Sequence, residues 1–232
     1  MANKVVHFKS IGAVTFFRTR RAKNMKISVK PDKTVLVSFP YFVSEKEVLA
    51  FLSRNEEWIE KQRDKVEDRR TSFSDDTVIK TKWHKIKLHR GDSYHAYASG
   101  NEIEVFVEDF HSERTREFID RFLAEVYRHE ARKLLPPRLR ELAARYGFEY
   151  NRVTIRNNKR NWGSCSSRNN ISLNLQMMKL PDELIDYVLL HELVHTEIKN
   201  HSPNFWARLN EVTQNRAREL AMEVRKYSTY TL

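Results

Sequence analysis

The chain has 232 residues, of which 40% are hydrophobic and 31% charged, and its formal net charge is +11. This balance is typical of a soluble globular protein with one large or two small domains, and it excludes a disordered chain. No apolar run approaches the ~20 residues that cross a bilayer, and no signal peptide opens the sequence, so we expect no membrane contact. The single cysteine, Cys165, excludes an internal disulfide and favours a cytoplasmic location.

Basic residues are concentrated near the N-terminus. The first 40 residues contain one acid, Asp32, and nine basic residues: Lys4, Lys9, Arg18, Arg20, Arg21, Lys23, Lys26, Lys30 and Lys33. Such a surface attracts polyanions, including nucleic acid and nucleotide phosphates. A solvated strand face is an equally weighted alternative, because no zinc-finger or RNP-type motif accompanies the charge.

Alternating apolar and polar residues predict a basic β-hairpin at residues 14–39, with its turn at Pro31-Asp32-Lys33. The capping box Ser44-Glu-Lys-Glu47 then predicts the start of a helix. Five apolar residues of that helix are expected on one side: Val48, Phe51, Leu52, Trp58 and Ile59. Strand patterns return at residues 77–107. Together with the hairpin they are expected to form one small antiparallel sheet in a β-rich subdomain, residues 1–110.

The second half is predicted to be mainly helical. Apolar residues from Phe118 to Tyr127 recur at helical spacing, Pro136-Pro137 is expected to interrupt that helix, and Gly147 ends its second piece. Two short strands, around Val153 and over residues 171–175, flank a polar loop. Pro181 begins the next helix. The last helix is expected from Pro203 to about Tyr227. No internal repeat is evident in the sequence.

The helix after Pro181 carries the pattern H-E-x-x-H at His191, Glu192 and His195. Residues four apart lie on one face of a helix, so the two imidazoles can bind one zinc ion. Glu192 lies about 100° round the helix. There it is placed to accept a proton from a water molecule on the metal instead of binding the metal itself. Surface histidines on an amphipathic helix are the alternative interpretation.

His201 is the predicted third metal ligand. It follows His195 by six residues, the histidine spacing of the metzincin motif. The glycine of that motif is replaced by Ile198, so we expect the chain to turn at Asn200 in a left-handed conformation, with Ser202-Pro203 starting the next helix. Glu211, in the final helix, is the competing third ligand.

Other residues are candidates for contacts with the substrate. Tyr187, Arg160 and Asn174 could stabilise negative charge in the transition state, although Tyr187 also fits a core position. The strand Ile171-Ser-Leu-Asn-Leu175 could pair with an extended peptide. Lys159 and Arg160, or the cluster from Arg18 to Lys23, could instead hold phosphates. A short strand followed by a metal-binding helix is the order found in zincin-type peptidases.

The sequence resembles the YgjP-like family of metal-dependent hydrolases, predicted zinc metallopeptidases related to the SprT and WLM groups. The resemblance covers nearly the whole chain and rests on these motifs: Trp162-Gly-Ser-Cys165, Asn174, Pro181, Tyr187 to His195, Asn200-His201-Ser202 and Phe205-Trp206. It implies one zinc ion on His191, His195 and His201, with Glu192 as general base, and it makes Trp162 a further candidate for substrate binding. Many members carry Arg directly before the Trp, where this chain has Asn161, so Arg160 is the candidate to replace it.

The expected fold class is therefore α+β, with a helical, zincin-like catalytic domain at residues 111–232. The expected function is a zinc metallopeptidase acting on peptide or protein. The resemblance also leaves a UTP pyrophosphohydrolase open, since that activity has been assigned within the family. A nucleic-acid-associated module with structural zinc is the second alternative, and it is disfavoured because structural zinc sites use four protein ligands.

Overall fold

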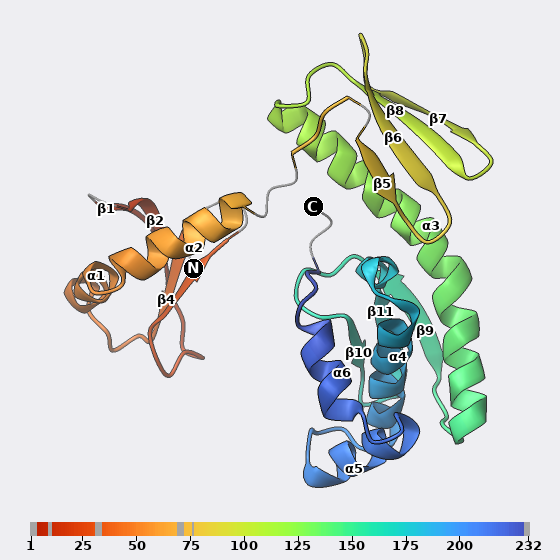
Figure 1. Ribbon diagram of the computed structural model, residues 1–232. Helices are drawn as coiled ribbons and strands as arrows, with labels where there is room; N and C mark the ends of the chain where they lie inside the picture. The colour runs from red at the N-terminus through yellow and green to blue at the C-terminus, as the bar shows by residue number, and fades with distance from the viewer. Residues whose placement is uncertain (1–3, 9–10, 31–33, 69–71, 76, 230–232) are drawn as a thin grey trace. The chain divides into compact units, whose positions relative to one another are not determined.

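The computed structural model describes residues 4–8, 11–30, 34–68, 72–75 and 77–229 (Figure 1). The α+β fold class is confirmed. The chain divides into two compact units, within residues 1–71 and 72–232. The boundary predicted at residue 110 falls inside the second unit, because the strands before it share a hydrophobic core with the long helix after it. The predicted turn at Pro31-Asp32-Lys33 lies outside the described residues.

The first unit contains a four-stranded sheet in the order β1-β2-β4-β3. Its strands are β1 (Lys4–Phe8), β2 (Gly12–Arg18), β3 (Lys26–Val29) and β4 (Val35–Phe39). The hairpin of β3 and β4 is confirmed, with Ile27 opposite Val37. However, β2 and β4 are parallel. The sheet is therefore mixed, and the predicted single antiparallel sheet is wrong, because strands after residue 77 form a sheet of their own.

Two helices pack on this sheet, α1 (Glu45–Ser53) and α2 (Glu56–Asp68), where one was expected. The predicted capping box is present: Ser44 accepts a hydrogen bond from the Glu47 amide, and the Glu47 carboxylate accepts one from the Ser44 amide. Val48, Leu52 and Ile59 are buried as predicted, whereas Trp58 is 44% exposed. The break between the helices changes the helical phase, so a single apolar stripe cannot continue across it.

The second unit begins with a sheet of order β5-β6-β8-β7. Its strands are β5 (Val78–Lys80), β6 (Lys85–Arg90), β7 (His95–Ser99) and β8 (Glu102–Val107). Its central pair is parallel and its outer pairs are antiparallel. This is the topology of the first sheet, so the chain contains an internal structural repeat that its sequence does not reveal.

A single long helix, α3 (Glu113–Tyr146), connects this sheet to the rest of the unit (Figure 1). Pro136 and Pro137 lie inside it and do not interrupt it, contrary to the sequence-based expectation. The two prolines remove hydrogen bonds to the carbonyls four residues earlier. Those carbonyls belong to the exposed residues Arg132 and Lys133, where water can bind them. Gly147 ends the helix with a φ of 75°, as predicted.

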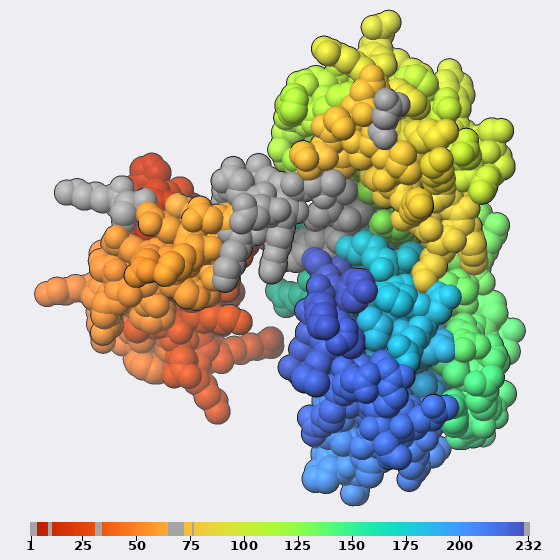
Figure 2. All heavy atoms as spheres, viewed as in Figure 1, coloured from red at the N-terminus to blue at the C-terminus, as the bar shows by residue number. Residues whose placement is uncertain are grey.

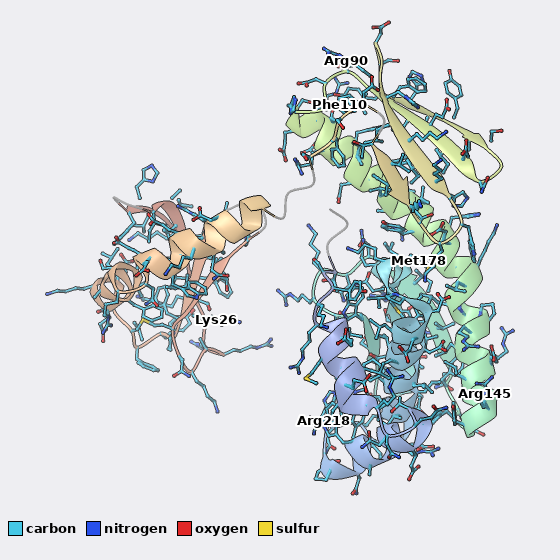
Figure 3. All side chains as sticks on the ribbon, viewed as in Figure 1. Lys26, Arg90, Phe110, Arg145, Met178 and Arg218 are labelled. Carbon is cyan, nitrogen blue, oxygen red and sulfur yellow. The ribbon has the colours of Figure 1, made fainter. Side chains whose placement is uncertain are left out.

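A third sheet, of order β10-β11-β9, lies before the metal-binding helix. Its strands are β9 (Arg152–Arg156), β10 (Gly163–Cys165) and β11 (Asn170–Asn174). The 3₁₀ helix η1 (Leu175–Lys179) follows and packs on α3. Met178, labelled in Figure 3, is one of its buried side chains.

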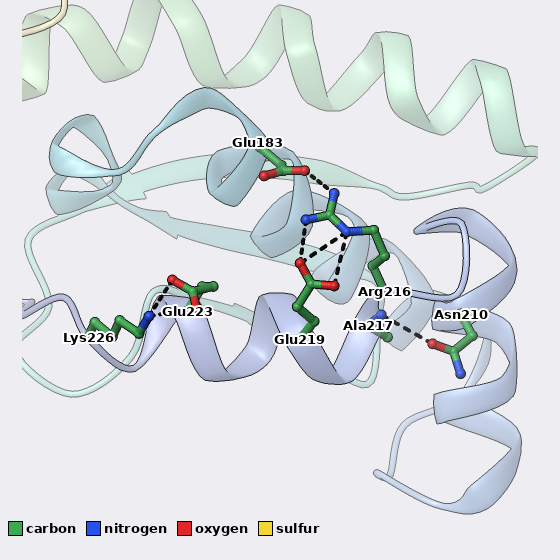
Figure 4. A network of polar contacts seen from close by, with 7 residues as sticks. All are labelled: Glu183, Asn210, Arg216, Ala217, Glu219, Glu223 and Lys226. Carbon is green, nitrogen blue, oxygen red and sulfur yellow. Dashed lines mark hydrogen bonds and ion pairs between the residues drawn. The ribbon is translucent and has the colours of Figure 1, made fainter.

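The helix α4 (Asp182–Glu197) packs against α3, and α5 (Pro203–Val212) and α6 (Ala217–Val224) pack on α4. Figure 2 shows α5 and α6 in blue on the surface of this unit. The single last helix predicted from residue 203 is thus two helices, because Gln214 and Asn215 have positive φ angles. Arg216 contacts Glu183 at the start of α4 and Glu219 in α6, which ties the two helices together (Figure 4). No helix within the described residues is long and apolar enough to cross a membrane.

Candidate metal centre

Three histidines converge at the C-terminal end of α4. His191 and His195 are one turn apart on the helix, and His201 follows it in the segment that leads to α5. One ligand nitrogen from each ring lies within 4.8 Å of the other two. The Nε2 atoms of His191 and His201 are 3.1 Å apart. Sequence spacing therefore identified three side chains that the fold does bring together.

The turn after α4 does not use a left-handed Asn200. The helix ends at Ile198, whose backbone is extended, and Asn200 is absent from the residues with positive φ. Ser202 and Pro203 do begin α5, as predicted. The Ile198 carbonyl accepts a hydrogen bond from Nδ1 of His195, at 2.9 Å. This bond places the proton on Nδ1 and leaves Nε2 of His195 with a lone pair for a metal.

Phe205 packs against all three imidazoles. Its ring centroid is 4.9 Å from that of His191, 4.5 Å from that of His195 and 4.7 Å from that of His201. Burial and the two neighbouring imidazoles lower the pKa of His191 to about 3, and burial also lowers the pKa of His195. Both rings are therefore neutral near pH 7, which is the form that binds metal.

Glu192 is buried beside the histidines, with 5% of its surface exposed. Its Oε2 atom is buried and has no hydrogen-bond partner among the described residues. Burial raises the pKa of Glu192 to about 8. Since a buried carboxylate is costly without a partner, this environment favours a neighbouring cation or a substrate-derived donor.

The strand β10 runs directly over Glu192. A Cβ atom on Gly163 would lie 2.7 Å from both Cγ and Oε1 of Glu192. Gly163 was not among the predicted site residues, although it belongs to the Trp162-Gly-Ser-Cys165 motif. An isolated glycine in a strand often marks a close approach of this kind, and that signal could have identified it.

The third sheet has two edge strands, β10 and β9, and β10 is the one that lies against Glu192. The strand expected to grip a peptide, β11, is the central one. That expectation was wrong because β10 is too short and polar to show an alternating pattern. The backbone amide of Asn174 donates to the Trp162 carbonyl, and the backbone amide of Ser166 donates to the Asn170 carbonyl. Alternation along an antiparallel pair then points the backbone groups of Gly163 and Cys165 away from β11.

The four predicted substrate contacts occupy different environments. Asn174 is 2% exposed, and its side-chain amide donates to the backbone carbonyls of Asn158 and Asn161. It therefore stabilises the loop between β9 and β10. Tyr187 is buried, and its pKa is raised to about 12 chiefly by burial. Trp162 is half-buried and lines a small pocket beside β10, and Arg160 is exposed.

Glu211, the competing third ligand, and the single cysteine are both held by other contacts. Glu211 is exposed and pairs with Arg208 at 2.9 Å, whereas His201 faces the other histidines. The Cys165 thiol has a raised pKa, mainly through burial, and lies 3.8 Å from Nζ of Lys199. Lys199 also donates to the Ser166 carbonyl, and thereby fixes the end of β10 to the segment between α4 and His201.

The donor set fits a zinc ion. Two nitrogens bound to one tetrahedral zinc lie about 3.3 Å apart, close to the separation of 3.1 Å between His191 and His201. His195 presents an unprotonated Nε2, and the unpartnered Oε2 of Glu192 lies in the same buried region. Among the described residues, these histidines are the one group of three or more potential ligands that could hold a metal.

Comparison with known proteins places the chain in a family. No curated protein matches it. Two matching solved structures are metallopeptidase zymogens, jannalysin of Methanocaldococcus jannaschii at 24% identity and abylysin of Pyrococcus abyssi at 25%. Each match covers 40% of this chain and 94% of the other, with a TM-score of 0.36. The family model described as YgjP-like, metallopeptidase domain matches residues 23–225. Because this match spans most of the sequence, the chain belongs to the YgjP-like family of metallopeptidase domains.

Proposed function

We propose that the protein is a zinc-dependent peptidase, with one zinc ion held by His191, His195 and His201 and with Glu192 as general base. The observation that carries this proposal is the position of β10, an edge strand of the third sheet. It lies against Glu192, which is on the same helix as His191 and His195. Three histidines leave one coordination position open, as in catalytic zinc sites and unlike structural ones.

Zinc bound at this site would lower the pKa of a coordinated water toward about 7 and polarise the substrate carbonyl. Glu192 accepts the proton of the attacking water and then returns it to the leaving amine. Its burial beside the histidines supports this role, because a zinc ion there would stabilise the carboxylate form that accepts the proton. Gly163 and the walls around Glu192 keep bulk water from the carboxylate.

An extended peptide would bind as an added strand beside β10. The outward-pointing Gly163 amide and the Cys165 amide and carbonyl offer hydrogen bonds for such pairing, whereas the Gly163 carbonyl already accepts one from Nδ2 of Asn161 at 2.8 Å. Because Gly163 is in close contact with Glu192, a peptide paired with the edge of β10 would pass next to both the base and the histidines. Peptide backbone, recognised independently of most side chains, is therefore the substrate that this arrangement suits.

The test is hydrolysis by the zinc-loaded full-length protein of two substrate panels, mixed-sequence peptides and nucleoside triphosphates including UTP. The proposal expects peptide cleavage that a chelator abolishes and added zinc restores, with products identified by mass spectrometry. Turnover of UTP without any peptide cleavage would contradict it and favour the pyrophosphohydrolase alternative.

A further inference from the structure

The first unit carries a group of exposed aromatic and basic side chains that the peptidase site does not use. The first 71 residues hold 16 basic and nine acidic residues, so they account for +7 of the net charge of +11. Five basic side chains lie in and beside the β2–β3 loop, and all five are exposed: Arg18, Arg20, Arg21, Lys23 and Lys26. Lys26 is labelled in Figure 3.

Topology brings this loop next to the loop between β4 and α1. Strands β2 and β4 are parallel and end together, at Arg18 and Phe39, and β3 begins beside them with Lys26 opposite Ser38. The Thr19 amide donates to the Phe39 carbonyl, and the Arg18 guanidinium donates to the Val43 carbonyl. Two loops from distant parts of the sequence therefore form one surface at this end of the sheet.

Aromatic rings are exposed on the same surface. Phe42 is 83% exposed and Tyr41 is 39% exposed. The Arg20 guanidinium lies 5.6 Å from the Tyr41 ring centroid. Two acids at the start of α1 have other partners, since Glu45 pairs with Lys4 and Glu47 bonds to Ser44. Glu45 also interacts with the charge of Arg18. Two adjacent exposed rings beside the basic side chains therefore combine apolar surface with positive charge, and both are accessible to a ligand.

We propose that this surface, formed by residues 18–26 and 41–42, binds single-stranded nucleic acid. Cations contact backbone phosphates and exposed rings stack on unpaired bases, which is the combination that single-strand-binding proteins use. A duplex offers phosphates but hides its base faces, so Phe42 and Tyr41 favour the single strand. The surface would thus hold the peptidase near proteins that lie on exposed single strands.

The test uses the full-length protein and a fluorescent oligodeoxythymidine of about 12 nucleotides, a length within known site sizes. Binding is followed by anisotropy at several salt concentrations, with a duplex of equal length and anionic phosphatidylserine vesicles as competitors. Phe42→Ala is expected to weaken oligonucleotide binding by at least about fivefold. The triple variant Arg20→Ser, Arg21→Ser, Lys23→Ser is expected to make the logarithmic salt dependence shallower by about 2.

A matched triple variant removes the same charge elsewhere: Lys46→Ser in α1, Arg54→Ser at the C-cap of α1 and Lys61→Ser in α2, all at exposed positions. It should bind almost as the wild type does, and circular dichroism should show every variant folded. Three results would each overturn the proposal: an unchanged affinity for Phe42→Ala, equal losses in both triple variants, or competition by duplex or vesicles as strong as by the single strand. None of these results depends on peptide cleavage.

Discussion

Gly163 and Glu192 are in such close contact that no larger residue fits at position 163 without movement. The Cβ of an alanine there would lie 2.7 Å from Cγ and Oε1 of Glu192, well inside van der Waals contact. The strand proposed to pair with a peptide and the carboxylate proposed as base are thereby positioned against each other.

Gly163→Ala should therefore reduce peptidase activity by about 10–100-fold, because a small displacement of the base or of the edge strand misplaces the reacting groups. Overpacking should also lower the free energy of unfolding by about 1–3 kcal/mol. Steady-state kinetics and denaturant unfolding measure the two effects. Ser164→Ala is the control, since the exposed Ser164 side chain points to the other face of β10. Unchanged kinetics in Gly163→Ala would mean that the contact has no part in catalysis.

The sequence was most informative where local rules decide the structure. Helical periodicity placed His191 above His195, and the capping box predicted the start of α1. His201 was also found from spacing, although the turn that delivers it uses an extended Ile198 instead of a left-handed Asn200.

Features that depend on contacts between distant parts of the chain could not be predicted from local sequence patterns. The parallel pairing of β2 with β4 joins strands whose alternation alone gives no direction. Pro136 and Pro137 remain helical because burial of Leu135 and Leu139 on the same helix outweighs two lost hydrogen bonds. The edge position of β10 follows from its neighbours in the sheet, which periodicity within three residues cannot reveal.

His201→Ala should weaken zinc affinity by more than about 100-fold, since even residues that only support a ligand contribute about 10–100-fold. Glu211→Ala should bind zinc as the wild type does, because the Glu211 carboxylate pairs with Arg208. Competition titration with a zinc indicator measures both affinities. The opposite ranking would make Glu211 the third ligand.

Glu130 should be a major determinant of stability in the second unit. It is fully buried, and its carboxylate accepts hydrogen bonds from the Lys82 and Trp83 amides and contacts Nδ1 of His84 at 2.8 Å. In Glu130→Gln an NH₂ group replaces one carboxylate oxygen, and this group cannot accept the hydrogen bond of a facing backbone amide. The free energy of unfolding should therefore fall by about 2–4 kcal/mol. Glu125→Gln, on the same helix but exposed, should change it by less than about 0.5 kcal/mol. Equal effects in urea titrations would show that the buried network is unimportant.

Lys179 should make stability depend on pH. Burial lowers its pKa from the ordinary 10.5 to about 8. Between these values the unfolded chain binds more protons than the folded chain, so this lysine makes stability rise as pH increases from 8 to 10.5. Lys179→Met should be more stable than the wild type at pH 7, with a difference that shrinks as pH rises. Chemical denaturation at a series of pH values measures it, and a constant difference would contradict the assigned cause.

The most direct test of the account is a paired measurement on Glu192→Gln. The amide keeps the size of the side chain and cannot accept the proton of the attacking water. We predict that the variant binds about one zinc per chain, as the wild type should, and unfolds at the same denaturant concentration or higher, because it removes a buried carboxyl group. Its peptide turnover, followed by mass spectrometry of the products, should fall by at least about 100-fold. Wild-type turnover in a zinc-loaded Glu192→Gln protein would contradict the central claim that this carboxylate is the general base.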